Sequence, residues 1–275
     1  MSDIRTVEEW LRSITAELHD AAERPRREAE LLLMEHLQCD QLWIMMHAQE
    51  RVENPRRLIE WIQRRKAHEP FEYIVNRVSF YSQMFYIAPG ALIPRPETEI
   101  LIDTVLENVD REAEITLAEV GVGSGVISII LAQQLPHAKI IATDISDDAL
   151  KVARKNIEAF GLEERISLRK GSLLDAVEEK IDLLVSNPPY IANAVPLEKN
   201  LDYEPDTALF GGTVGDEIIQ ELIGEVLKRK IPCFTCEMGY DQKEKVEGFV
   251  SSFSLQSLQF YKDLAGFDRG FTLKI

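Results

Sequence analysis

Residues 181–190 read IDLLVSNPPY and join an apolar run to the tetrapeptide Asn187-Pro188-Pro189-Tyr190. The run carries a single early charge, at Asp182, which is typical of a buried strand. Proline supplies no N–H to a sheet ladder, so the strand must end at the first proline. We therefore expect a stiff loop at the carboxyl end of a strand, with Asn187 at its lip, where open α/β sheets bind ligands.

The tetrapeptide suits chemistry on a planar amide or amine. An –NH2 group on an sp2 carbon is a poor nucleophile because its lone pair is delocalised, so a catalyst has to hold both hydrogens. The side-chain carbonyl of Asn187 and the backbone carbonyl of Pro188 supply two acceptors, and Tyr190 can pack against a flat substrate. We predict Asn187, Pro188 and Tyr190 as catalytic residues, and these three with Pro189 as substrate-binding residues. The alternative is a plain Pro-Pro turn.

Composition limits the classes of protein to consider. The chain has 275 residues, a net charge of −16 and three cysteines, with no apolar run near membrane-spanning length. The start, MSDIRTVEEW, has no basic-then-apolar signal pattern, so we expect a cytoplasmic protein that meets no membrane. Residues 81–275 hold 19 basic and 32 acidic residues, a balance of −13 that disfavours stable binding to DNA or RNA.

The first 70 residues predict a small helical domain, with helices over 7–18, 25–37, 41–46 and 54–66. Its basic clusters, at residues 24–27, 56–57 and 64–66, are interpreted either as solvated helix faces or as a docking patch for a protein partner. Residues 73–87 are rich in aromatic and β-branched side chains and predict a hairpin or extended linker, within a linker region of 71–95. A helix is expected from just after Pro96 to about Val109.

Strand and helix patterns alternate over the remainder, residues 96–275, which we predict to be one α/β domain with a mostly parallel, seven-stranded sheet. The predicted strands are 116–120, 139–143, 165–169, 181–186, 233–237, 255–260 and 271–275. The predicted helices are 126–134, 147–160, 216–229 and 242–252.

A glycine-rich loop closes the first of these strands. Residues 119–125 read EVGVGSG, and Asp144 follows about 20 residues later at the end of the second strand. Such a pair is typical of a dinucleotide or of another nucleoside cofactor. The spacing here is G-x-G-x-G rather than G-x-G-x-x-G, and Glu119 places a carboxylate beside the loop. A carboxylate opposes a pyrophosphate and suits a cation, which favours S-adenosylmethionine over NAD.

The sequence resembles the bacterial peptide chain release factor glutamine methyltransferases, the PrmC/HemK family. The stretches that carry the resemblance are LIPRPETE (92–99), EVGVGSG (119–125), VSNPPYI (185–191), YEPDTALFGG (203–212) and LAGFDRG (264–270). Asn-Pro-Pro-Tyr alone is shared with adenine methyltransferases, whereas LIPRPETE and YEPDTALFGG are more specific to the release factor family.

The resemblance implies a class I, Rossmann-like methyltransferase with S-adenosylmethionine as cofactor and S-adenosylhomocysteine as product. It implies N5 methylation of the glutamine in the Gly-Gly-Gln loop of class I release factors, by a monomer whose N-terminal domain docks the substrate. The expected cofactor-binding residues are Glu119, Gly121, Val122, Gly123, Ser124, Gly125, Asp144, Ser172, Leu173 and Asn187. Glu119 departs from the family, which usually has Asp there, and Gly171-Ser172-Leu173 departs beside the adenine.

Three alternatives stay open at this stage. One is an N6-adenine methyltransferase of RNA or DNA, and another is a non-catalytic module that binds release factors or ribosomes. The third concerns Cys233-Phe234-Thr235-Cys236, a C-x-x-C pattern that suggests zinc or redox chemistry. Residues three apart on a strand face opposite sides, so we interpret the pair as core cysteines and expect no metal site.

Overall fold

The computed structural model describes residues 5–275. Residues 1–4, which belong to the expected N-terminal domain, lie outside the described part. The chain divides into two compact units. The first contains the residues up to 76 together with 198–203, and the second contains 77–197 and 204–275. The division falls after residue 76 rather than 70, because helix α5 (Phe71–Val75) packs its apolar side chains into the core of the first unit.

The first unit is a helical bundle, as the sequence predicts. Thr6 caps its first helix by accepting from the backbone N–H of Glu9, and the Glu9 carboxylate accepts from the N–H of Thr6 in return. Trp10, Ile14 and Leu32 lie in a shared apolar core. Besides α5, the helices of this unit are α1 (Val7–Glu17), which Thr6 caps, α2 (Pro25–Leu37), α3 (Gln41–Met46), α4 (Arg56–Lys66) and the 3-10 helix η1 (Leu201–Tyr203).

Most basic side chains of the three clusters in this unit form ion pairs inside it. Arg65 is buried, and its Nε donates to Glu28 at 2.5 Å. Arg24, Arg56 and Arg57 are exposed, and the Arg57 guanidinium lies over the Trp61 ring at 4.5 Å. The remaining pairs are Arg26–Glu30, Arg27–Glu30, Arg64–Glu69 and Lys66–Glu17. Arg65–Glu28 and Lys66–Glu17 join α4 to other helices, and the other pairs are local. Most of the cluster charges are thus compensated within the unit, which leaves few cations for a partner.

Residues 71–95 do not form one linker. Residues 71–75 are helical, and the hairpin is shorter than expected, with strands β1 (Arg77–Phe80) and β2 (Gln83–Tyr86). Its two-residue turn, Tyr81-Ser82, has φ of 51° and 58°, the left-handed geometry that matches the twist of a hairpin. Glycine or asparagine usually marks such a turn, and because neither is present at Tyr81 or Ser82, the hairpin could be placed only approximately from the sequence.

The hairpin belongs to the second unit and is tied to its helix α8 (Asp147–Ala159). Asn156 on α8 accepts from the N–H of Tyr86 at 2.8 Å and donates to its carbonyl at 2.9 Å. The same Asn156 amide also donates to the carbonyl of Ser124 at 2.8 Å. One buried amide thus joins the hairpin to the glycine-rich loop.

The second unit is built on a seven-stranded sheet in the order β10-β11-β9-β6-β3-β4-β5. Neighbouring strands are parallel, except that β11 runs antiparallel to both β9 and β10. The mostly parallel sheet predicted from the sequence is thus confirmed. Its strands are β3 (Thr116–Val120), β4 (Lys139–Asp144), β5 (Ile166–Lys170), β6 (Leu183–Ser186), β9 (Cys233–Glu237), β10 (Ser257–Lys262) and β11 (Asp268–Lys274).

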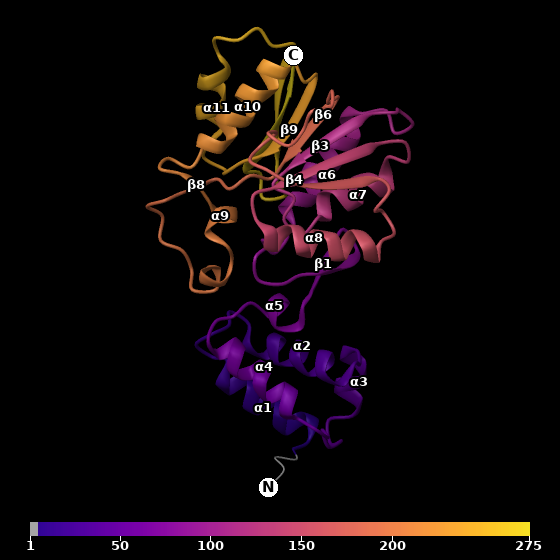
Figure 1. The fold of residues 1–275 in the computed structure, drawn as a ribbon. Helices are drawn as coiled ribbons and strands as arrows, with labels where there is room; N and C mark the ends of the chain where they lie inside the picture. The colour runs from indigo at the N-terminus through magenta and orange to yellow at the C-terminus, as the bar shows by residue number, and fades with distance from the viewer. Residues whose placement is uncertain (1–4) are drawn as a thin grey trace. The chain divides into compact units, whose positions relative to one another are not determined.

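Helices cover both faces of this sheet (Figure 1). Helices α10 (Glu217–Arg229) and α11 (Lys243–Val250) pack on one face, over a core that includes Leu184, Phe234 and Ile223. Helices α6 (Glu97–Asn108), α7 (Val126–Gln134) and α8 lie on the other face. The remaining elements are α9 (Asp206–Leu209) and a two-stranded pair of β7 (Ile191–Ala192) with β8 (Phe210–Gly212).

The predicted elements of the sheet unit are present, with ends that differ by up to about three residues. The largest difference is at β11, which begins at Asp268 rather than at 271 because Asp268 pairs with Lys262 of β10 and Gly270 pairs with Glu237 of β9. Strand β6 begins at Leu183 rather than 181. Among residues 5–275, no helix is both long and apolar enough to cross a membrane.

Candidate active site

The order of the strands reverses between β3 and β6, and the functional segments meet at that point. Val120, the last residue of β3, lies opposite Thr143 of β4 and Ser186 of β6. The loops that follow these three strands therefore start side by side. This is the carboxyl edge of a parallel sheet at its switch point, where ligands bind in such folds.

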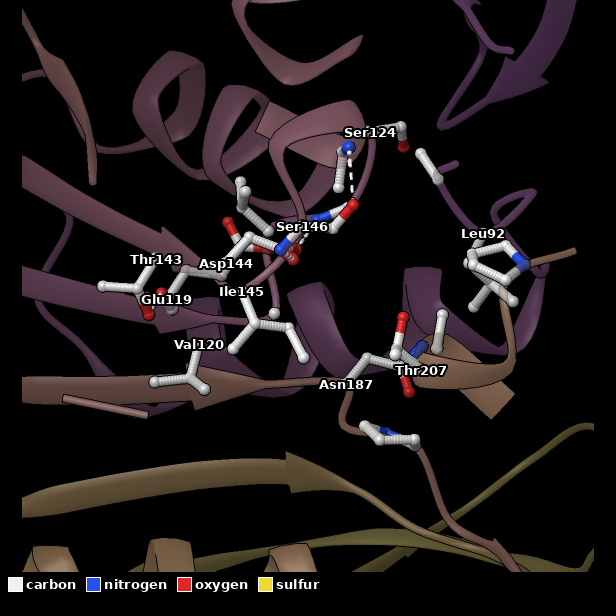
Figure 2. Close-up of a pocket in the computed structure, with 18 of the residues that line it drawn as sticks. Leu92, Glu119, Val120, Ser124, Thr143, Asp144, Ile145, Ser146, Asn187 and Thr207 are labelled. Atoms are coloured by element: carbon white, nitrogen blue, oxygen red, sulfur yellow. Dashed lines mark hydrogen bonds between the residues drawn. The ribbon is translucent and has the colours of Figure 1, made fainter. Parts of the chain in front are cut away.

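A cavity of about 300 Å³ lies at this edge, within the second unit. Figure 2 shows Glu119, Asp144 and Asn187 around it, from three different strand ends. Gly125, Pro188 and Tyr190, also predicted from the sequence, are not among the lining residues. The predicted residues that line it are Glu119, Gly121, Val122, Gly123, Ser124, Asp144, Ser172, Leu173, Asn187 and Pro189.

The glycine-rich loop needs glycine for its backbone geometry. Gly123 has φ of 52° and Gly125 has φ of 84°, values that residues with a side chain rarely adopt. A Cβ on Gly125 would also lie 3.4 Å from the Ala153 backbone on α8, whereas a Cβ on Gly123 would meet nothing within 4 Å. Gly125 thus serves helix packing, which explains why it does not line the cavity, while Gly123 leaves the cavity side open.

Asp144 ends β4 and holds the loop in place. Its carboxylate accepts from the N–H of Gly123 at 3.0 Å and from the N–H of Ser146 at 2.8 Å. Burial raises the pKa of Asp144, and the backbone donors oppose that shift. The carboxylate faces the cavity with further acceptor capacity, which suits a diol.

Glu119 is buried beneath the loop with one oxygen unused. Its Oε2 accepts from the N–H of Ser128 at 3.0 Å and from the Ser128 hydroxyl. Among the described residues, its Oε1 has no hydrogen-bond partner. Burial raises the pKa of Glu119 to about 8, and the nearby charge of Asp144 adds to the shift. A buried acceptor without a partner in a cavity wall fits a cationic ligand, because its charge would be compensated only on binding.

Asn187 belongs to a buried hydrogen-bonded chain that the sequence did not reveal. Its Nδ2 donates to the hydroxyl of Thr98 at 3.0 Å, and that hydroxyl donates to Oε2 of Glu237 at 2.8 Å. Tyr190 donates its hydroxyl to the other Glu237 oxygen at 3.2 Å. Tyr190 packs against the core under α10 and does not line the cavity, so its ring is not placed to stack on a substrate.

The register of the sheet brings these groups together. Ser186 of β6 lies opposite Cys236 of β9, so the next residues, Asn187 and Glu237, are neighbours at the strand ends. Thr98 arrives from the first turn of α6. Sequence spacing gives no sign of this contact, because it depends on which strand lies beside β6.

Strand β8 and the turn that follows it pack against the backbone of the tetrapeptide Asn187–Tyr190. A Cβ on Gly211 would lie 2.3 Å from the carbonyl oxygen of Pro189, and one on Gly215 would lie 2.6 Å from that of Tyr190. Side chains at these two positions would push the tetrapeptide backbone away. Gly211, in the FGG part of YEPDTALFGG, and Gly215, just after that stretch, are therefore required for close backbone packing.

The start of the same stretch is joined to LIPRPETE. Glu204 is buried, accepts from the N–H of Ile93 at 2.9 Å, and pairs with Arg95 at 2.5 Å. This ion pair fixes two loops that both contribute to the cavity wall. The lining residues that sequence analysis missed include Leu92, Pro94, Thr98, Ile145, Thr207 and Phe210.

Comparison with known proteins agrees with this geometry. Residues 96–200 match the Methyltransferase small domain family, and residues 9–75 match the PrmC N-terminal domain family. Release factor glutamine methyltransferase of Koribacter versatilis is 37% identical over 254 residues, which cover 89% of each chain. The Clostridium botulinum enzyme of the same name is 36% identical, over 88% of this chain and 89% of its own.

The chain belongs to the release factor glutamine methyltransferase family. The family carries both expected parts, the helical domain and the α/β methyltransferase domain. Among solved structures, the hMettl16 catalytic domain in complex with a MAT2A 3′UTR hairpin has a TM-score of 0.57 at 16% identity, over 79% of each chain. The N-terminal domain of human METTL16 has a TM-score of 0.52 at 14% identity, over 76% of this chain and 91% of its own. These two establish the fold alone.

Within this family member, the departures noted in the sequence have structural explanations. Leu173 has φ of 46°, and its carbonyl accepts from the Thr143 hydroxyl at 2.8 Å, so a strained turn sets the Gly171-Ser172-Leu173 wall. Both Ser172 and Leu173 line the cavity.

The C-x-x-C pattern lies away from this cavity. Cys233 and Cys236 are free thiols at opposite ends of β9, and only Cys236 is fully buried. The expectation of two buried core cysteines is therefore wrong for Cys233, which is half-buried at the first residue of the strand. Within residues 5–275, no three His, Cys, Asp or Glu side chains form a group that could hold a metal ion.

Proposed function

We propose that this chain transfers the methyl group of S-adenosylmethionine to the side-chain amide nitrogen, N5, of the glutamine in the Gly-Gly-Gln loop of class I peptide chain release factors. Family membership supports the reaction type and the substrate class. The observation that carries the proposal is the orientation of Asn187. Its Nδ2 is engaged by Thr98, so its carbonyl oxygen is left for a substrate in the cavity that Asn187 lines.

The residues at the other end fit the cofactor. Asp144 would hold the ribose hydroxyls, Glu119 would face the positive charge through its partnerless Oε1, and Gly121 and Gly123 would let the backbone approach. Ser172 and Leu173 would contact the adenine. When bound, S-adenosylmethionine supplies a methyl group on a positively charged sulfur and leaves as S-adenosylhomocysteine.

The residues of the tetrapeptide position the nucleophile. The Asn187 side-chain oxygen and the Pro188 backbone carbonyl would each accept one hydrogen of the glutamine amide, which fixes the nitrogen and its direction of attack. Pro188 does not itself line the cavity, but it lies between Asn187 and Pro189, which both do. The amide nitrogen forms one bond to carbon and gives up one proton, which becomes more acidic as the bond forms. Tyr190 takes a different task from the one expected, because its hydroxyl is engaged with Glu237.

The helical unit would add affinity for the release factor, by docking parts of it beyond the loop. A substrate that works in translation places the reaction in the cytoplasm. The acidic balance of residues 81–275 argues against bulk binding to nucleic acid, the alternative substrate class.

The test measures transfer of a labelled methyl group to a purified class I release factor. A matched release factor, with the loop glutamine replaced by alanine, is the control. We expect label on the first protein and none on the second. RNA and DNA are offered in parallel reactions, and labelling of adenine without labelling of the release factor would overturn the proposal in favour of an adenine methyltransferase.

A further inference from the structure

We propose that Glu237 and Thr98 act together as a positioning relay. The relay fixes which end of the Asn187 side-chain amide, the carbonyl oxygen or the –NH2 group, is turned to the substrate. The inference rests on the proposed function, and it adds two residues to which neither the sequence motifs nor the family comparison assigns a role. Neither residue needs to touch the reacting atoms, since the effect passes through Asn187.

The direction of the relay follows from counting protons. An ionised Glu237 accepts only, so the hydroxyls of Thr98 and Tyr190 must each donate to one of its oxygens. Thr98 has a single hydroxyl proton, and once it is given to Glu237 the oxygen is left as an acceptor. The Asn187 side chain must then turn its –NH2 group to Thr98, at 3.0 Å. Its carbonyl oxygen is consequently the group left for the cavity.

Without the relay the orientation is lost. If the Thr98 hydroxyl proton were free, it could donate to the Asn187 oxygen, and the amide could rotate by about 180° at little cost because the two ends have nearly the same shape. The –NH2 group would then face the –NH2 group of the substrate. Two donors facing each other repel, and the substrate nitrogen would lose the acceptor that aims it.

The burial of Glu237 indicates that its role is more than structural. Glu237 is 1% exposed, and a buried carboxylate is costly compared with an apolar residue of similar size. Burial raises the pKa of Glu237 to about 7. The charged and titratable groups around it are Glu97 on α6, Arg269 on β11, Tyr190 after β6, Tyr261 on β10, and Cys236 on its own strand. Arg269 opposes the shift and Glu97 adds to it.

A matched pair of variants separates the relay from packing. Thr98→Val keeps the shape of the side chain and removes the hydroxyl, whereas Thr98→Ser keeps the hydroxyl and removes a methyl group. At saturating cofactor, we expect the single-turnover rate of methyl transfer to the release factor to fall about 10- to 100-fold in Thr98→Val and to stay within about 3-fold in Thr98→Ser. Cofactor affinity should stay within about 2-fold in both.

The pH dependence provides a second readout. The wild-type rate should rise between pH 6 and 8 as Glu237 ionises and locks the relay, and Glu237→Gln should lose that rise. A packing role would instead lower the melting temperature of the variants and leave their pH profile and their rate per folded molecule unchanged. That result, or a Thr98→Ser as slow as Thr98→Val, would overturn the relay.

A measurement without turnover separates this inference from the proposed function. The side-chain amide protons of Asn187, assigned by their absence in Asn187→Ala, are followed by NMR. We expect slow exchange with solvent in the wild type and Thr98→Ser, and fast exchange in Thr98→Val. Equal exchange in all three would refute the relay even if the release factor is methylated. Protected protons with no methylation of the release factor would refute the proposed substrate and leave the relay standing.

Discussion

The two ends of the cavity are built in different ways. At the cofactor end, Gly123 and Asp144 are hydrogen-bonded at a sequence separation of 21 residues, with Gly123 just after β3 and Asp144 at the end of the adjacent β4. At the substrate end, Thr98 and Glu237 are bonded at a separation of 139 residues, and Thr98 also accepts from Asn187. A local motif makes the first end, whereas the register of distant strands makes the second. Cofactor binding and substrate orientation can therefore be changed separately.

The largest effect should come from Asn187→Ala, which removes the acceptor of the substrate end. The glycine loop and Asp144 remain, so cofactor affinity should change little. The rate constant kcat should fall at least about 100-fold, the scale of a lost positioning contact. Melting temperature, cofactor affinity and single-turnover rate are measured on the same sample. A near-normal rate in the folded variant would remove the catalytic role of Asn187.

At the cofactor end, Asp144→Ala should have the opposite profile. It removes a charge-assisted acceptor for a diol and a bond to the loop, so cofactor binding should weaken by roughly 1–3 kcal/mol. The rate at saturating cofactor should stay close to that of the wild type. Calorimetry gives the affinity, with Asp147→Ala as the control because that exposed carboxylate pairs with Lys170 instead. Wild-type affinity in Asp144→Ala would sink the assignment.

The same contrast explains what could be predicted from the sequence. The Gly121–Gly125 turn and Asp144 were predictable, because glycine spacing and an acidic residue after the next strand are local signals. The sheet followed from the alternation of buried runs and helices. Tyr190 was misplaced, because only the pairing of β6 with β9 turns its hydroxyl to Glu237. Thr98 and Glu237 were missed for the same reason, and Gly211 because it serves a contact with backbone from another segment.

Glu119, at the cofactor end, should make the stability of the chain depend on pH. Its pKa is raised from 4.5 to about 8 in the folded chain, so between these values the native state keeps a proton that the unfolded state has lost. The free energy of unfolding therefore falls as pH rises through that window. Glu119→Gln does not titrate, so its melting temperature without cofactor should exceed that of the wild type by at least about 2 °C at pH 8, and by less at pH 5.

Cofactor binding should show the reverse preference. A cationic ligand favours ionised Glu119, so wild-type affinity should rise several-fold from pH 6.5 to 8.5 with release of a proton, and Glu119→Gln should lose this dependence. Calorimetry in buffers of different ionisation enthalpy counts the protons. A variant that keeps the wild-type pH dependence would show that another group faces the cation.

The smallest effect should come from the helical unit, where a change ought to alter neither end of the cavity. Among the cluster residues in the described part of the chain, Arg24, Arg56 and Arg57 are exposed and form no salt bridge. The Arg57 guanidinium lies over the Trp61 ring, so Arg24 and Arg56 are the cations available to a partner. Replacing both by glutamate should raise KM for the intact release factor about 3-fold or more, because exposed charges contribute up to about 1 kcal/mol each and act mainly on association. Cofactor affinity and kcat should stay unchanged, and the increase in KM should shrink at high salt.

The control variant is Arg26→Glu. The Arg26 side chain already pairs with Glu30, so this substitution should lower the melting temperature and leave KM unchanged. If the double variant has the same KM as the wild type, the clusters contribute only to the structure of the helical unit, and the release factor is recognised without them.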